Sequence, residues 1–298
     1  MVKELFSGSA PAVICPMKQD GSVDIEAFDR LIVHLIDEGV SALVINGTTG
    51  EASTLTSAEK SELVKHAVQI ADHRVPVIAG AGSNNTQLAI EAAKQAKEAG
   101  ADGLLLVTPY YNKTSQAGLK AHFEAIVDAV QLPAILYTVP GRTGMNILPE
   151  TVEALAKHPY IVGIKDATGS MAYTIEVIRR TQGLDFSVYS GEDRLTLPII
   201  ACGGRGVISV TSNIYPAGME AIARNSLDGN YDEARKTMLA LDAFIQLMFA
   251  DVNPIPVKAA MAKAGYGANM VRLPLVPTSD ALQEKISQAM DELSQKGY

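Results

Sequence analysis

The chain has 298 residues, a length that suits one α/β barrel with an extension as well as two domains of ordinary size. Hydrophobic residues make up 47 % of it and charged residues 19 %, which indicates a large core that needs no disulfides to fold. The formal net charge of −8 argues against nucleic acid and anionic membranes as partners.

Short apolar runs alternate with amphipathic helical patterns up to residue 216. The runs predict eight strands: Ala12–Cys15, Ala42–Ile45, Val75–Ala79, Gly103–Val107, Ala134–Tyr137, Ile161–Lys165, Ser187–Ser190 and Gly206–Ser209. The predicted helices, with starts marked by Asp24, Ser57 and Ser115, are Ile25–Glu38, Ala58–Ala71, Thr86–Ala99, Gln116–Ala129, Pro149–Ala156 and Met171–Thr181. Eight strand-helix units predict a closed (β/α)₈ TIM barrel, an α/β fold, rather than an open doubly wound sheet.

Beyond residue 216 the pattern predicts only helices, with prolines between them. These helices are Gly218–Asn225, Tyr231–Met248, Val257–Ala264 and Asp280–Lys296. We therefore divide the chain into a barrel, residues 1–216, and a C-terminal helical domain, residues 217–298.

The most informative residue is Lys165, which ends the predicted strand Ile161–Lys165. The two-residue period of a strand places Ile161, Gly163 and Lys165 on one face, and Gly163 is expected to leave open space beside it. A partly desolvated lysine loses pKa and becomes an amine nucleophile, as Schiff-base chemistry on a carbonyl substrate requires. The alternative is a strand-end lysine that reaches water.

Other polar side chains follow neighbouring strands, where the active site of such a barrel is built. The turn Asn46–Glu51 offers free N–H groups and the hydroxyls of Thr48 and Thr49 to a carboxylate. Tyr137 is expected to point inward, either as a proton relay beside the lysine or as a rim residue. Arg142 lies in a loop rich in proline and glycine. Either its guanidinium binds a second carboxylate through two parallel N–H groups, or it is a solvated loop arginine.

Two further loops contribute candidates. Tyr110 and Tyr111 follow the fourth strand, and we expect them to be buried against a neighbouring subunit. Gly191 and Ile208 either complete the floor of the site with backbone groups or are ordinary barrel residues.

Metal and disulfide chemistry have little support in the sequence. The sequence has five histidines, which are expected at helix surfaces or helix ends: His34, His66, His73, His122 and His158. None belongs to a metal-binding motif, and none lies at a strand end, where a Ser-His-Asp hydrolase would need its histidine. Cys15 and Cys202 lie in apolar runs and are expected to be buried free thiols. The start of the chain lacks the pattern of a signal peptide or a membrane helix, so we expect a cytoplasmic protein. We also expect that it needs no metal or cofactor.

Five motifs, in order along the chain, together resemble the dihydrodipicolinate synthase family: Gly47–Glu51, Tyr137–Gly144, Gly163–Gly169, Gly206–Asn213 and Asn253–Lys258. The resemblance spans nearly the whole chain. It implies a class I, Schiff-base lyase that condenses pyruvate with aspartate 4-semialdehyde in lysine and diaminopimelate biosynthesis. It also implies a homotetramer built as a dimer of dimers.

The resemblance implies specific catalytic roles. Lys165 would form the imine with pyruvate, and Tyr137 would pass protons to and from that intermediate. Thr48 and Tyr111 would connect Tyr137 to solvent, with Tyr111 reaching in from the adjacent subunit.

Substrate binding would fall to four further residues. Thr49 and the Ile208 backbone would hold the carboxylate and keto region of pyruvate, and Arg142 would receive the carboxylate of aspartate 4-semialdehyde. Gly191 is a further candidate for substrate binding. N-acetylneuraminate lyases and ketodeoxysugar acid aldolases are alternatives within the superfamily, but they typically lack the Arg142 loop. A non-catalytic barrel that binds a small anion is an alternative of another class.

The resemblance also bears on regulation. Lysine-inhibited members bind free lysine near the positions of Ala52, Ser53, Ser57, Lys60, Asn84, Leu88 and Tyr110. Leu88 offers no counter-charge here, and Lys60 would repel the ammonium of the effector. We therefore expect little or no inhibition by lysine, unless Asn84 and Tyr110 still hold its carboxylate.

Overall fold

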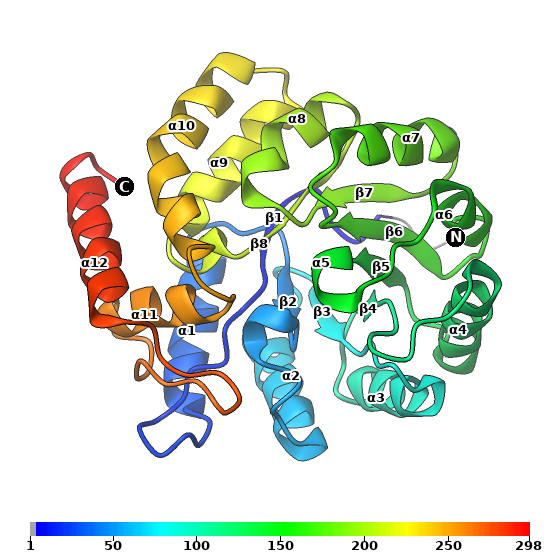
Figure 1. Cartoon of the computed structure of the whole chain (residues 1–298), viewed down its shortest axis with the longest axis horizontal. Helices are drawn as coiled ribbons and strands as arrows, with labels where there is room; N and C mark the ends of the chain where they lie inside the picture. The colour runs from blue at the N-terminus through cyan, green and yellow to red at the C-terminus, as the bar shows by residue number, and fades with distance from the viewer. Residues whose placement is uncertain (1–3) are drawn as a thin grey trace.

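A computed structural model describes residues 4–298 and shows eight parallel strands surrounded by helices (Figure 1). The strands follow the order β1-β8-β7-β6-β5-β4-β3-β2. Their bounds are β1 Gly8–Pro11, β2 Leu43–Ile45, β3 Val77–Gly80, β4 Gly103–Val107, β5 Ala134–Thr138, β6 Ile161–Asp166, β7 Ser187–Ser190 and β8 Gly206–Ser209. A parallel bridge between Ala12 and Val44 joins the two ends of the sheet, so the predicted barrel is confirmed.

The first strand was predicted in the wrong place. It covers Gly8–Pro11 rather than Ala12–Cys15, whereas the other predicted strands differ from the observed ones only at their ends. After the bridge at Ala12, the Asn213 side chain accepts from Ile14 N and donates to Ala12 O, so side-chain bonds replace a ladder there. The apolar run reflects burial and not strand pairing.

The helices around the sheet begin close to the predicted positions. Asp24 and Ser115 cap their helices as predicted, but the cap of the second helix is Thr56 and not Ser57. The short helices α5 and α8 were not predicted. The bounds are α1 Ile25–Asp37, α2 Ser57–Ala71, α3 Thr86–Glu98, α4 Gln116–Val130, α5 Pro140–Thr143, α6 Pro149–Leu155, α7 Met171–Thr181 and α8 Thr196–Ala201, with 3₁₀ turns η1 Thr48–Gly50, η2 Asp193–Leu195 and η3 Thr211–Asn213.

The C-terminal part is helical, as the sequence predicts. It consists of α9 Pro216–Leu227, α10 Tyr231–Met248, α11 Ile255–Lys263 and α12 Asp280–Gln295. Helix α9 packs on β1, where the Glu220 carboxylate accepts from Ser9 N at 2.7 Å. Helix α12, red in Figure 1, lies beside α10 and α11 at the edge of the molecule. No helix within residues 4–298 is both long and apolar enough to cross a membrane.

Aromatic side chains fill part of the barrel interior. Tyr189 of β7 stacks on Phe6 with 4.4 Å between ring centroids, and its hydroxyl donates to Phe6 O. A Cβ on Gly163 would lie 3.2 Å from the Tyr189 ring and 2.7 Å from Ser187 O. The expectation of open space beside Gly163 is therefore wrong, because the backbone carbonyl of Ser187 and the Tyr189 ring come so close that only glycine fits there.

Candidate active site

Lys165 lies inside the barrel near the C-terminal end of β6. In register it stands between Tyr137 of β5 and Tyr189 of β7, and only 6 % of the residue is exposed. Its Nζ lies 4.5 Å from the centroid of the Tyr137 ring. The alternative of a strand-end lysine reaching water does not describe this residue.

The surroundings of Lys165 favour its neutral form. Burial lowers the pKa of Lys165 to about 8, the Asp193 carboxylate opposes this shift, and the Arg142 cation adds to it. At pH 7 a pKa near 8 leaves about one lysine in ten as a free amine, against about one in 3000 for an ordinary lysine. The side chain is therefore suited to attack a carbonyl carbon.

Asp193 is a buried charge that sequence reasoning missed. Its carboxylate accepts from Thr211 N at 2.8 Å and from Val210 N at 3.3 Å, and the residue is fully buried. Burial raises the pKa of Asp193. It thus fixes the loop after β8 while providing the counter-charge to Lys165. The only signal in the sequence is a pair of acids, Glu192 and Asp193, one residue beyond the end of the seventh predicted strand.

Gly191 and Ile208 lie close to Lys165. A Cβ on Gly191 would be 3.0 Å from Lys165 Cε and 2.8 Å from Ala167 Cβ, so a side chain there would displace the lysine. Ile208 is buried with the residues of the barrel interior. Gly191 thus leaves the space that the Lys165 side chain occupies.

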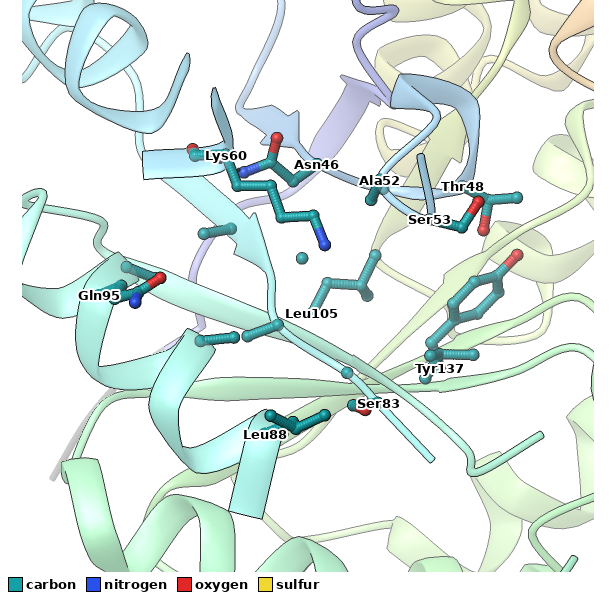
Figure 2. A pocket seen from close by; sticks show the side chains of 18 of the residues that line it. Asn46, Thr48, Ala52, Ser53, Lys60, Ser83, Leu88, Gln95, Leu105 and Tyr137 are labelled. Carbon is teal, nitrogen blue, oxygen red and sulfur yellow. Dashed lines mark hydrogen bonds between the residues drawn. The ribbon is translucent and has the colours of Figure 1, made fainter. Parts of the chain in front are cut away.

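Tyr137 and Thr48 face one another across the mouth of the barrel. Figure 2 shows the Tyr137 phenol pointing toward the Thr48 hydroxyl. Burial raises the pKa of Tyr137, while the Thr48 hydroxyl and the Arg142 cation act in the opposite direction. A protonated phenol next to an amine and a second hydroxyl can exchange protons with both.

The turn that carries Thr48 and Thr49 is held rigidly. Asn46 and Glu51, at its two ends, have φ values of 57° and 53° in the left-handed region. The Glu51 carboxylate, inside the protein, accepts from Lys258 Nζ at 2.5 Å and from Arg272 N at 3.0 Å. A Cβ on Gly80 would lie 2.1 Å from Asn46 O, so only glycine admits the turn beside β3.

Arg142 lies on α5, directly after β5, and contacts the C-terminal part of the chain. Its Nη2 donates to Asn253 O at 2.9 Å, and Asn253 Nδ2 donates to Thr49 Oγ1 at 3.0 Å. The sequence motif Asn253–Lys258 carries part of the family resemblance, but the sequence does not mark Asn253 as a site residue. Its contacts with two distant segments could not be read from the sequence.

Tyr111 does not join this group within the chain. It is 93 % exposed with φ at 67°, and it does not line the cavity that contains Tyr137. Tyr110 is 40 % exposed and does line that cavity.

One cavity of about 450 Å³ extends from the candidate site to the space between α2 and α3. Thr48, Tyr137 and Arg142 line one end, and Lys60, Leu88 and Gln95 are among the residues at the other. Lys60 points into this space in Figure 2 and forms no ion pair within residues 4–298. Burial lowers the pKa of Lys60.

Two predictions about reactive side chains need correction. Cys202 is exposed because it caps the end of α8, whereas Cys15 is buried and burial raises its pKa to about 12; both thiols are free. His122 is buried rather than at the surface, with Nδ1 2.9 Å from Thr86 Oγ1. Among residues 4–298, no cluster of histidine, cysteine or acidic side chains could hold a metal ion.

Comparison with known proteins identifies the family. The profile of the dihydrodipicolinate synthetase family matches residues 5–293. A protein of Alkaliphilus oremlandii named 4-hydroxy-tetrahydrodipicolinate synthase is 46 % identical over 292 residues, covering 98 % of this chain and 99 % of the relative. A protein of the same name from Citrifermentans bemidjiense is 49 % identical over 288 residues, covering 97 % and 99 %.

A solved structure adds a match in three dimensions. The chloride-inhibited dihydrodipicolinate synthase from Acinetobacter baumannii, crystallised with pyruvate, superposes with a TM-score of 0.94 at 41 % identity. That superposition covers 96 % of this chain and 98 % of the other. Because the profile and these relatives span almost the whole chain, it belongs to the dihydrodipicolinate synthetase family.

Proposed function

We propose that this protein condenses pyruvate with aspartate 4-semialdehyde, through a Schiff base on Lys165, to give 4-hydroxy-tetrahydrodipicolinate. The observation that carries the proposal is the buried Lys165, whose pKa falls to about 8 beside the Tyr137 ring. The names of the relatives and the pyruvate bound to the Acinetobacter baumannii enzyme agree with it. The product belongs to lysine and diaminopimelate biosynthesis.

The reaction begins when the free amine of Lys165 attacks the keto carbon of pyruvate. Loss of water from the resulting carbinolamine gives a protonated imine, whose positive charge the buried Asp193 stabilises. Tyr137 supplies the proton that leaves with water and later removes one from the pyruvate methyl group, giving an enamine. The enamine carbon then attacks the aldehyde carbon of the second substrate. The amino group of that substrate displaces Lys165 from the imine carbon, which closes the ring of the product and frees the lysine.

Proton exchange with solvent passes from Tyr137 to Thr48 and then to Tyr111 of a second subunit. The exposed position of Tyr111 within one chain supports a role across an interface. We infer that the protein assembles as a homotetramer, a dimer of dimers, in the cytoplasm, with no nucleic acid or membrane partner and no cofactor. The barrel of residues 1–216 would provide the chemistry and residues 217–298 would support it.

Substrate recognition rests on two sites for carboxylates. Thr49, Gly191 and the Ile208 backbone bind pyruvate, and Arg142 pairs with the carboxylate of aspartate 4-semialdehyde. A guanidinium at the cavity wall favours this substrate over the sugar-derived aldehydes of N-acetylneuraminate lyase and the ketodeoxysugar acid aldolases. A non-catalytic barrel has no need of a buried lysine with a lowered pKa.

A steady-state comparison of substrates tests the proposal. The enzyme should consume pyruvate with aspartate 4-semialdehyde and form product, and it should not cleave N-acetylneuraminate or a ketodeoxysugar acid. Turnover of a sugar acid without turnover of aspartate 4-semialdehyde would support the alternative and contradict the proposal.

A further inference from the structure

Asn253 connects the two proposed carboxylate sites. It lies in the turn before α11 and is 9 % exposed. Its side-chain Nδ2 donates to the Thr49 hydroxyl at 3.0 Å, and its backbone carbonyl accepts from Arg142 Nη2 at 2.9 Å. One residue of the C-terminal part therefore contacts a residue of the β2 loop and a residue of α5.

The hydrogen bond from Asn253 determines whether the Thr49 hydroxyl acts as a donor or as an acceptor toward a ligand. A threonine hydroxyl has one proton to donate and two lone pairs to accept with. Asn253 occupies one lone pair, and the buried Thr49 side chain has no other hydrogen-bond partner within residues 4–298. Its proton is therefore available to an acceptor, and a carboxylate oxygen is the strongest acceptor that a substrate of this site offers.

Of the two polar side-chain atoms of Asn253, only the donor has a hydrogen-bond partner within residues 4–298. Asn253 Oδ1 is buried and has no partner in the described part of the chain, an arrangement that normally destabilises a protein. An apolar side chain of similar size would avoid that penalty. Retaining an amide there is understandable if its N–H group is needed to orient Thr49.

We infer that Asn253 is a positioning residue, which fixes the Thr49 hydroxyl as a hydrogen-bond donor to the carboxylate of pyruvate. The inference rests on the proposed function, because it names the ligand of Thr49. The surrounding structure holds Asn253 in place. The α11 residues that follow it are buried, and Lys258 of α11 pairs with Glu51, at the end of the turn that carries Thr49.

A double-mutant cycle on the full-length protein tests this inference. Asn253→Ala removes the donor, and Thr49→Val removes the hydroxyl while keeping the side-chain shape. Asn253→Ala should raise the KM for pyruvate about five- to twentyfold, with kcat lowered less than about threefold. In the Thr49→Val background the same change should raise that KM less than about twofold, because the hydroxyl it acts on is gone.

Two features of the experiment separate positioning from a general loss of structure. The contact with Arg142 uses the backbone carbonyl, so the KM for aspartate 4-semialdehyde should stay within about threefold in Asn253→Ala. Asn253→Asp is nearly isosteric but can only accept, so it would take the Thr49 proton and should raise the pyruvate KM more than alanine does. Asn225→Ala on α9 loses a bond to Ala221 O away from the site and serves as the matched control.

The contrary outcomes are distinct. Equal effects of Asn253→Ala in both backgrounds, or equal increases in the KM values of both substrates, would overturn the inference and leave the proposed function standing. An unmodified enzyme that forms no imine with pyruvate would overturn both.

Discussion

The charge balance around Lys165 can be changed at Asp193. The carboxylate of Asp193 raises the pKa of Lys165, in opposition to burial, and the result is a pKa of about 8. Compared with an ordinary lysine, this value increases the free amine at pH 7 about 300-fold. Because Lys165 loses its proton as the pH rises through about 8, imine formation should accelerate over that interval and then level off. Asp193→Asn should move the midpoint to lower pH.

The same substitution should weaken the product of that step. The imine is protonated, so loss of the nearby carboxylate removes its counter-charge and should speed its hydrolysis. The variant is thus expected to form imine faster at pH 7 and yet hold less of it at equilibrium.

Single-turnover imine formation with pyruvate, followed from pH 6 to pH 10, measures both effects. Glu192→Gln is the matched control, because the neighbouring Glu192 is not among the charges that shift Lys165. A thermal unfolding midpoint close to that of the unmodified protein verifies that the Asp193→Asn variant stays folded. A midpoint that stays at pH 8 or moves upward would refute the electrostatic argument.

Three further predictions concern the second substrate, the assembly and regulation. Arg142→Ala should lower kcat/KM for aspartate 4-semialdehyde about 30- to 1000-fold and leave pyruvate imine formation nearly unchanged, as single-turnover and steady-state kinetics can show; equal losses for both substrates would contradict its role. Tyr111→Phe should retain the imine but lose most turnover, and mixing it with inactive Tyr137→Phe under verified subunit exchange should restore activity; no recovery would contradict a relay across subunits. Millimolar lysine should leave the activity nearly unchanged, because the Lys60 cation points into the cavity and Leu88 supplies no carboxylate. Lys60→His with Leu88→Glu should create sensitivity, and half-inhibition of the unmodified enzyme below a millimolar would overturn this expectation.

Most of the fold could be predicted because strand and helix periods are local properties of the sequence. The run Gly103–Val107 and the helix Met171–Thr181 have the predicted bounds. The prediction of a strand at Ala12–Cys15 was wrong, because a buried apolar segment resembles a strand even when a side chain provides the hydrogen bonds of its backbone groups. The prediction that Cys202 is buried was wrong for a related reason. The apolar run before it ends at the C-cap of α8, where the chain turns to solvent.

The site could be predicted in part. Lys165 and Tyr137 come together because they end adjacent strands in register. The contacts of Asn253 and Asp193 depend on how distant segments pack, and no spacing in the sequence encodes that. The reason for glycine at Gly163 also required the structure, because the backbone carbonyl and the ring that occupy the space belong to the next strand.

The most direct test of the central claim is to trap the imine. The enzyme is incubated with pyruvate and borohydride, digested, and analysed by mass spectrometry, with a Lys165→Ala variant treated in parallel. The account predicts a reduced pyruvate adduct on the peptide that contains Lys165 and none in the variant. An unmodified enzyme without an adduct, or a variant that still traps pyruvate on another lysine, would contradict it.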